Sequence, residues 1–121
     1  MGVDLLEVAR LEQAIARRGE RLLQRLFTDR ERAYCERFKT KYERYAGRFA
    51  AKEAAMKALG TGWRGGVRWQ DLEVVREASG RPTMALHGEA GKIAARLGVK
   101  HISMSITHTA IEAFAEVIFE S

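Results

Sequence analysis

The sequence predicts an α+β fold in which a small antiparallel sheet packs with a long central helix and several shorter helices. Two observations predict this class. Apolar residues recur at helical spacing through the first half of the chain, whereas apolar and polar residues alternate in short runs through the second half. Strands that follow helices, with one helix between them, are typical of α+β proteins. With 121 residues, the chain is expected to form one domain over residues 1–121.

Three helices are expected before residue 40. Residues 4–18 place apolar side chains at helical spacing, so we expect an amphipathic helix that begins just after Asp4, with Asp4 as its N-cap. A second, short helix is expected to stop near Thr28. Thr28 and Glu31 have the spacing of a capping box, which predicts a third helix that runs toward Phe38.

The longest helix is expected over residues 40–59, with Gly60 at its end and a glycine-rich loop over residues 61–66. Its apolar stripe consists of Tyr42, Tyr45, Ala46, Phe49, Met56 and Gly60. Glu53 falls in the middle of this stripe, where a carboxylate is costly unless it meets a charged partner, a metal or a ligand. Lys57 is four residues further on and can pair with it, so a solvated ion pair is the alternative interpretation.

Four strands and one helix are expected in the second half of the chain. The expected strands cover residues 72–76, 82–86, 100–107 and about 111–119, with a turn at residues 79–81 and a helix over residues 88–97. On the third strand, apolar residues alternate with hydroxylated ones, so one face is apolar and the other polar. His108 ends this strand, and a turn residue is the ordinary explanation of a histidine there.

The net charge of +5 is concentrated in the first half, because residues 10–48 hold 12 Lys and Arg against 6 Asp and Glu. A one-sided basic surface attracts nucleic acid, phosphorylated small molecules or acidic proteins. A nucleic-acid-binding module is therefore an alternative function. Against it, acids are interspersed among the arginines, and Tyr34, Tyr42 and Tyr45 fall at helical spacing instead of forming a stacking platform on a strand. We expect no nucleic-acid partner.

The composition favours a cytoplasmic location. Cys35 is the only cysteine and cannot form an intrachain disulfide, which fits a reducing compartment. The N-terminus lacks the basic region and apolar stretch of a signal peptide. No apolar run approaches the about 20 residues of a membrane span, so no membrane partner is expected.

Four short motifs occur along the chain in a characteristic order. They are Gly2-Val3-Asp4, Arg48-Phe49-Ala50-Ala51-Lys52-Glu53-Ala54, Gly80-Arg81-Pro82 and Ser105-Ile106-Thr107-His108-Thr109. Each motif alone is weak, but the ordered set resembles the holo-acyl-carrier-protein synthases, the small bacterial type of 4′-phosphopantetheinyl transferase. The resemblance covers essentially the whole chain and includes residues 26–31. It implies the 4′-phosphopantetheinyl transferase fold.

The resemblance implies that the protein transfers the 4′-phosphopantetheine group of coenzyme A to a serine of apo-acyl carrier protein, releasing adenosine 3′,5′-bisphosphate. Asp4 and Glu53 match the family's metal-binding acids, and two carboxylates with a diphosphate suit Mg²⁺. Lys57 matches a residue that contacts the diphosphate. Glu53 is expected to take the serine proton, directly or through a bound water, with His108 as a second candidate. The matched nucleotide-binding positions are Arg48, Lys57, Gly80, Arg81, Pro82, Thr107 and His108.

The resemblance also implies protein partners. In the family the first helix meets the acidic recognition helix of the carrier protein, and Arg10 and Arg17 match positions on that face, which Arg21 extends. Ordinary solvated arginines are the alternative. Family members assemble as homotrimers with active sites between neighbouring subunits, so we expect the same here. A non-enzymatic relative that only binds carrier protein is a further alternative, which the retained acids, lysine and histidine argue against.

One feature departs from the family. Relatives carry a few more residues before the Gly-x-Asp motif, where they form a first strand, whereas Met1 directly precedes Gly2 here. We therefore expect this strand to be short or incomplete, or the natural start to lie upstream.

Overall fold

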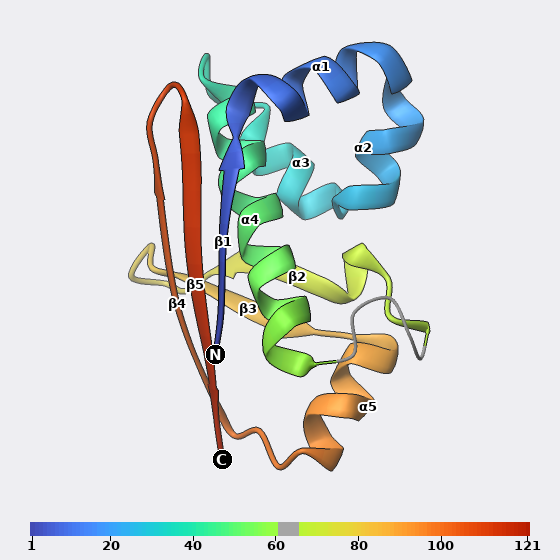
Figure 1. The fold of residues 1–121 in the computed structure, drawn as a ribbon, viewed down its shortest axis with the longest axis vertical. Helices are drawn as coiled ribbons and strands as arrows, with labels where there is room; N and C mark the ends of the chain where they lie inside the picture. The colour runs from blue at the N-terminus through green and yellow to red at the C-terminus, as the bar shows by residue number, and fades with distance from the viewer. Residues whose placement is uncertain (61–65) are drawn as a thin grey trace.

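The computed structural model describes residues 1–60 and 66–121 and confirms the α+β fold (Figure 1). The elements are β1 (Gly2–Glu7), α1 (Val8–Arg18), α2 (Glu20–Leu26), α3 (Asp29–Cys35), α4 (Lys41–Leu59), the short 3-10 helix η2 (Trp69–Asp71), β2 (Leu72–Arg76), β3 (Pro82–Leu86), α5 (Gly88–Arg96), β4 (His101–His108) and β5 (Glu112–Glu120). Strands β1, β5 and β4 form a three-stranded antiparallel sheet in that spatial order, and β2 pairs with β3 in a separate sheet. The loop expected over residues 61–66 lies, except for Gly66, outside the described residues.

The chain begins with a strand, so the prediction that a helix starts at Asp4 is wrong. Strand β1 pairs antiparallel with β5, and Asp4 lies opposite Ala115 in the middle of the strand. Glu7, not Asp4, occupies the N-cap position of α1. The pattern of residues 2–7 fits a helix or a strand, and the strand forms because β5 offers backbone hydrogen-bond partners. The first strand, which was expected to be short or incomplete, has six residues.

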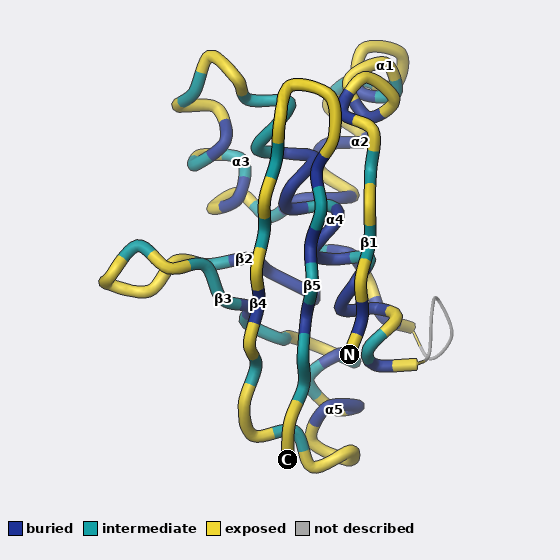
Figure 2. The backbone as a smooth tube through the Cα atoms, turned by 60° about the vertical axis from the view of Figure 1, so that its left-hand side comes forward, coloured by how far each residue is buried: buried dark blue, intermediate teal, exposed yellow. Residues whose placement is uncertain are grey.

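Helix α4 runs across the inner face of the three-stranded sheet, and two glycines allow the close approach (Figure 2). A Cβ atom on Gly2 would lie 1.8 Å from the carbonyl oxygen of Ala54, so β1 touches the backbone of α4 there. A Cβ atom on Gly47 would lie 2.9 Å from the Cγ2 atom of Ile106 on β4. Both edge strands of the sheet therefore place their inward side chains against the two flanks of α4.

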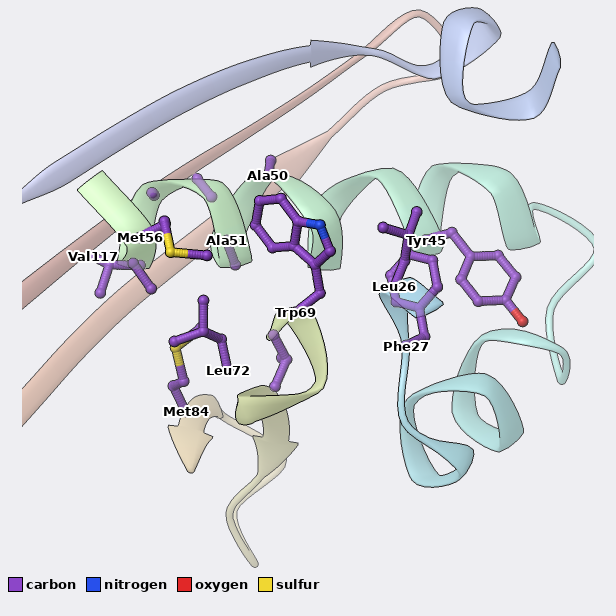
Figure 3. Packing of buried hydrophobic residues seen from close by; sticks show 14 of the residues in the cluster. Leu26, Phe27, Tyr45, Ala50, Ala51, Met56, Trp69, Leu72, Met84 and Val117 are labelled. Carbon is purple, nitrogen blue, oxygen red and sulfur yellow. The ribbon is translucent and has the colours of Figure 1, made fainter. Parts of the chain in front are cut away.

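The apolar stripe predicted for α4 is buried or half-buried except at Gly60, but it is too narrow, because the helix is buried on nearly every side. Arg48 and Lys52 are buried, whereas Gly60, an expected stripe member, is exposed. The opposite side of α4 from the sheet packs against α3, η2 and β2, as Figure 3 shows for Trp69 and Leu72. Glu53 is half-buried at the edge of α4 that faces β1. Its position is therefore explained by the packing of β1 against α4 and not by an apolar stripe on the helix.

Most of the other predicted elements are confirmed. The capping box of Thr28 and Glu31 opens α3, although α3 ends at Cys35 and does not reach Phe38. Gly60 ends α4 in the left-handed conformation. The β2–β3 and β4–β5 hairpins and α5 form within one or two residues of their expected bounds. No helix among the described residues has both the length and the apolar character needed to cross a membrane.

Candidate active site

Asp4, Glu53 and Lys57 meet where β1 crosses α4. The Nζ atom of Lys57 donates to Asp4 Oδ1 at 2.9 Å and to the carbonyl oxygen of Val3 at 3.1 Å. Lys57 is mostly exposed, whereas only 10% of the Asp4 side chain is exposed. The expected partner of Lys57 was Glu53, but the ion pair of the structure joins Lys57 to Asp4. The hydrogen bond to Asp4 raises the pKa of the Lys57 ammonium group.

The two carboxylates of this cluster are close enough to disturb each other. Burial raises the pKa of Glu53 to about 7; the neighbouring Asp4 carboxylate adds to this shift, and Lys57 opposes it. Asp4 Oδ2 is buried and has no hydrogen-bond partner. This oxygen can be satisfied in two ways: a protonated Glu53 can donate a hydrogen bond to Asp4, or a bound cation can contact the oxygen.

These observations fit a divalent cation. An ion between Asp4 and Glu53 would give the orphaned Asp4 Oδ2 a partner and remove the repulsion between two negative charges. Two carboxylates are the hard oxygen ligands that Mg²⁺ prefers, and Mg²⁺ fills its remaining positions with water and substrate phosphates. Among the described residues no three His, Cys, Asp or Glu side chains converge on one point. The pair alone would therefore supply the protein ligands.

His108 lies on the other flank of α4 and does not join this cluster. At the end of β4, its Nδ1 atom is 3.1 Å from Glu43 Oε1 and its Nε2 atom is 2.9 Å from Arg44 Nη1. Arg44 and Glu53 are about two and a half turns apart and so project from opposite sides of α4. Thr107 precedes His108 and points outward from the sheet, opposite Phe114.

Arg48 is buried on the same side of α4 as His108. Its guanidinium carbon lies 4.1 Å from the centre of the Tyr34 ring, and that of Arg76 lies 4.8 Å from the same ring. Together with Arg30 they line a cavity of about 170 Å³ between α3 and β2. Within the described part of the chain, none of these three arginines forms an ion pair with a carboxylate. Glu31 also lines the cavity but is paired with Lys52, so the three arginines leave an excess of positive charge around it.

Gly80 and Arg81 lie in the turn at the tip of the β2–β3 hairpin, and Pro82 is the first residue of β3. Gly80 has φ +89°, and the amide of Glu77 donates to the carbonyl oxygen of Arg81 across the turn. The hairpin projects on the β4 side of the molecule, away from β1 (Figure 2). For the described residues, no hydrogen bond or ion pair connects this turn to Asp4, Glu53 or Lys57. One chain thus presents the predicted site residues as two separate groups. The first group is Asp4, Glu53 and Lys57, and the second group lies on the β4 side of α4.

The predicted docking arginines all lie on the surface formed by α1 and α2. Arg10, Arg17 and Arg21 are exposed. Arg18 and Arg25, which the sequence prediction missed, join Arg21 and Leu22 around a hollow of about 560 Å³. In the regions described, no carboxylate pairs with any of these five arginines. The four-residue spacing of Arg21 and Arg25 on α2 was the available signal for Arg25, whereas Arg18 lies on α1, before the break at Gly19.

Comparison with known proteins gives matches that cover essentially the whole chain. Residues 1–115 match the family described as the 4′-phosphopantetheinyl transferase superfamily. A holo-[acyl-carrier-protein] synthase of Solibacter usitatus is 57% identical over 120 residues, which cover 99% of this chain and 96% of the relative. The crystal structure of the holo-[acyl-carrier-protein] synthase of Neisseria meningitidis matches with a TM-score of 0.89 at 28% identity and covers 99% of this chain and 96% of its own. That of Helicobacter pylori, in complex with coenzyme A, matches with a TM-score of 0.85 at 28% identity and 98% coverage of both chains.

Proposed function

The chain belongs to the 4′-phosphopantetheinyl transferase superfamily, and we propose that Asp4, Glu53 and Lys57 form the centre at which it transfers the group. It is a transferase that moves 4′-phosphopantetheine from coenzyme A to a serine of apo-acyl carrier protein. The serine oxygen forms a bond to the phosphorus next to the pantetheine, the diphosphate P–O bond breaks, and adenosine 3′,5′-bisphosphate leaves. The orphaned oxygen of Asp4 beside Glu53 is the observation that carries this assignment.

The residues of the centre have distinct roles in this proposal. Mg²⁺ held by Asp4 and Glu53 would supply positive charge to the diphosphate. Lys57, mostly exposed and hydrogen-bonded to Asp4, is directed to the same place and neutralises charge on the phosphate oxygens. The serine proton needs an acceptor, and Glu53 is the preferred one, directly or through a bound water, because it is a carboxylate at the transfer centre.

We assign the nucleotide part of coenzyme A to the second group of residues. This group consists of Arg48 on α4, Thr107 and His108 at the end of β4, and Gly80, Arg81 and Pro82 near the tip of the β2–β3 hairpin. Because this group faces away from Glu53, a single chain does not offer both halves to one coenzyme A molecule. A neighbouring subunit therefore supplies the second half.

This division supports a homotrimer with active sites between subunits. The outer face of the three-stranded sheet carries apolar side chains, including Val3 and Leu5, which are 40% and 61% exposed, and the half-buried Phe114 beside Leu5. Apolar surface of this kind is stabilised by association. In such a ring, the residues on the β4 side of one subunit would complete the centre formed by Asp4, Glu53 and Lys57 of the next. A molecular mass of one chain under assay conditions would contradict this arrangement.

The test of the proposed function is direct. The protein is incubated with coenzyme A, Mg²⁺ and apo-acyl carrier protein, and the mass of the carrier protein is measured. We expect the mass to rise by one phosphopantetheine group, and the rise to disappear when a chelator is added. A carrier protein of unchanged mass after prolonged incubation with folded enzyme would contradict the proposal.

We assign carrier-protein docking to the arginine surface of α1 and α2, defined by Arg10, Arg17 and Arg21. Reversal of two of these charges in the variant Arg10→Glu/Arg17→Glu is expected to raise the KM for carrier protein on the order of tenfold or more, because it replaces attraction to an acidic partner by repulsion. The KM for coenzyme A should stay nearly constant. Steady-state kinetics with each substrate varied in turn measures both values.

The matched control for docking is Arg96→Glu, which reverses an exposed charge on α5 at the far end of the molecule (Figure 1). Arg96→Glu should leave both KM values unchanged. An equal increase in the KM for coenzyme A and for carrier protein in the double variant would refute docking at this surface.

A further inference from the structure

The hydrogen bonds of His108 determine its tautomer. An arginine guanidinium has donors and no acceptor, so the Nε2 atom that contacts Arg44 at 2.9 Å must carry the lone pair. The proton of the neutral ring is then on Nδ1, and it is donated to Glu43 Oε1 at 3.1 Å. Glu43, His108 and Arg44 thus form a directed chain: Glu43 fixes the imidazole, and the imidazole holds the guanidinium.

Both ring nitrogens of His108 are used in this chain. The imidazole therefore has no nitrogen left for a substrate atom, which argues against its role as the base that takes the serine proton. Its evident effect is on Arg44. This is the familiar arrangement in which a carboxylate orients a histidine so that its second nitrogen serves another group.

The Arg44 guanidinium is held firmly but is not neutralised by a direct contact. Its central carbon lies 4.2 Å from the centre of the Phe38 ring, which fixes the plane of the group. Its Nε atom is buried without a hydrogen-bond partner, and among the described residues no carboxylate lies within 4 Å of its nitrogens. Because Nε is buried, only the outer nitrogens of this guanidinium can reach a ligand, and Nη2 is not among its buried atoms. A fixed guanidinium with a free outer nitrogen is suited to binding phosphate.

Arg44 also adjoins the other cations of this flank. The rings of Phe38 and Tyr34 lie 5.1 Å apart, and Arg48 stacks on Tyr34 as Arg44 stacks on Phe38. Two arginines one turn apart on α4 are thus backed by two touching aromatic rings. Two such like charges repel each other, and an anion bound between or beside them would relieve this repulsion.

We propose that Arg44 is a further phosphate-binding residue, which binds the 3′-phosphate of coenzyme A, and that Glu43 and His108 position it. This proposal rests on the proposed function. Coenzyme A carries two separate anionic groups, the diphosphate and the 3′-phosphate. The diphosphate must lie at the transfer centre with Lys57, on the opposite flank of α4. The remaining group that suits a single oriented guanidinium is the 3′-phosphate.

The first experiment measures binding and does not require turnover. Isothermal titration calorimetry compares adenosine 3′,5′-bisphosphate with adenosine 5′-monophosphate, which lacks the 3′-phosphate. We expect Arg44→Gln to weaken binding of the bisphosphate by about tenfold to a hundredfold, the value of a charge-assisted hydrogen bond, and to leave the monophosphate unaffected. Arg96→Gln, which removes the same charge from exposed α5, should change neither affinity.

The second experiment separates positioning from general destabilisation. Glu43→Gln keeps an oxygen that accepts the Nδ1 proton of His108, so the affinity for the bisphosphate should stay within about threefold. Glu43→Leu removes that acceptor and should weaken binding by about tenfold. Nitrogen NMR of the His108 ring should show the proton on Nδ1 in the wild type and in Glu43→Gln, with loss of this preference in Glu43→Leu. Thermal unfolding verifies that each variant is folded.

The outcomes are distinct from those of the transfer assay. Equal affinity of Arg44→Gln and wild type for the bisphosphate would overturn the proposal even if the enzyme modifies carrier protein normally. Weakening of both nucleotides to the same extent would overturn the assignment to the 3′-phosphate. Failure of the wild type to modify carrier protein would contradict the proposed function, whereas a selective loss of bisphosphate binding would still support the role of Arg44.

Discussion

Glu53→Gln is expected to lower the rate of phosphopantetheine transfer by about 10²- to 10⁴-fold, the range for loss of a general base, without unfolding the protein. The amide is nearly the same size as the carboxylate but neither accepts the serine proton nor contributes a negative charge to a Mg²⁺ site. Asp4→Asn should have a comparable effect. Rates are measured from the mass of the carrier protein at saturating coenzyme A.

Stability serves as the internal control for this prediction. The Asp4 carboxylate helps to raise the pKa of Glu53 to about 7, so the two negative charges disfavour each other in the metal-free protein. Glu53→Gln removes this repulsion, and the free energy of unfolding in the presence of a chelator should be equal or higher. Glu120→Gln, an exposed position at the end of β5, removes the same charge and should keep full activity. Normal transfer by Glu53→Gln would refute its assignment.

Glu53→Gln also tests whether each active site is shared between two subunits. Glu53→Gln lacks the transfer centre and His108→Ala lacks part of the nucleotide half, so each alone should be impaired. In mixed trimers formed by co-expression, about one quarter of the sites would combine two intact halves under random assembly. Activity above that of either parent is therefore expected. No recovery in assemblies shown to contain both chains would argue for a site within one subunit.

The elements that were predicted correctly have patterns contained in their own residues. The capping box at Thr28, the left-handed Gly60 and the alternation in β4 are local signals, and each corresponds to an observed boundary or strand. Strand β1 has no such signal. Its six residues fit two periodicities, and its hydrogen-bond partner β5 comes from the opposite end of the sequence. Secondary structure that depends on a distant partner is not contained in local propensity.

Three of the predicted site residues lie together in the structure, but their connections differ from those predicted. The family motifs identified Asp4, Glu53 and Lys57, and the structure brings these three together. Their pairing differs because β1 places Asp4 nearer to the Lys57 ammonium than spacing on a helix suggests. Glu43 and Arg44 were missed because adjacent charges near a helix start are common on solvated surfaces. Only their contacts with His108 of β4 distinguish Glu43 and Arg44 from such solvated charges.

The buried pair of Lys52 and Glu31 should dominate the effects of substitution on stability. Both side chains are fully buried, and Lys52 Nζ lies 2.7 Å from Glu31 Oε1 and donates to the Trp69 carbonyl oxygen at 2.9 Å. Glu31 also accepts hydrogen bonds from the amides of Thr28 and Val74. One ion pair thus connects α3, α4, η2 and β2. Burial lowers the pKa of Lys52, and Glu31 opposes this shift, so the lysine depends on its partner to stay charged.

Lys52→Met is expected to reduce the free energy of unfolding by about 3–5 kcal/mol, because it leaves the Glu31 carboxylate buried without a cation. That is a large part of the about 5–15 kcal/mol that stabilises a typical domain. Urea unfolding measures the change. The variant Lys52→Met/Glu31→Gln should recover part of the loss, since an amide keeps an oxygen for one backbone amide and carries no stranded charge.

The coupling between these two positions decides whether Lys52 is structural or part of the transfer centre. Lys52 forms its contacts with Glu31 and Trp69, whereas Glu53, the next residue along α4, faces Asp4 on the β1 side. Transfer by the folded fraction of Lys52→Met should therefore remain near the wild-type rate at low temperature. If the double variant were as unstable as the single one, the buried charge would not be the cause. A residue that only supports the fold affects the amount of active protein and not its rate. Lys52 would therefore belong to the catalytic centre if transfer by Lys52→Met fell as it does in Glu53→Gln while the free energy of unfolding stayed unchanged.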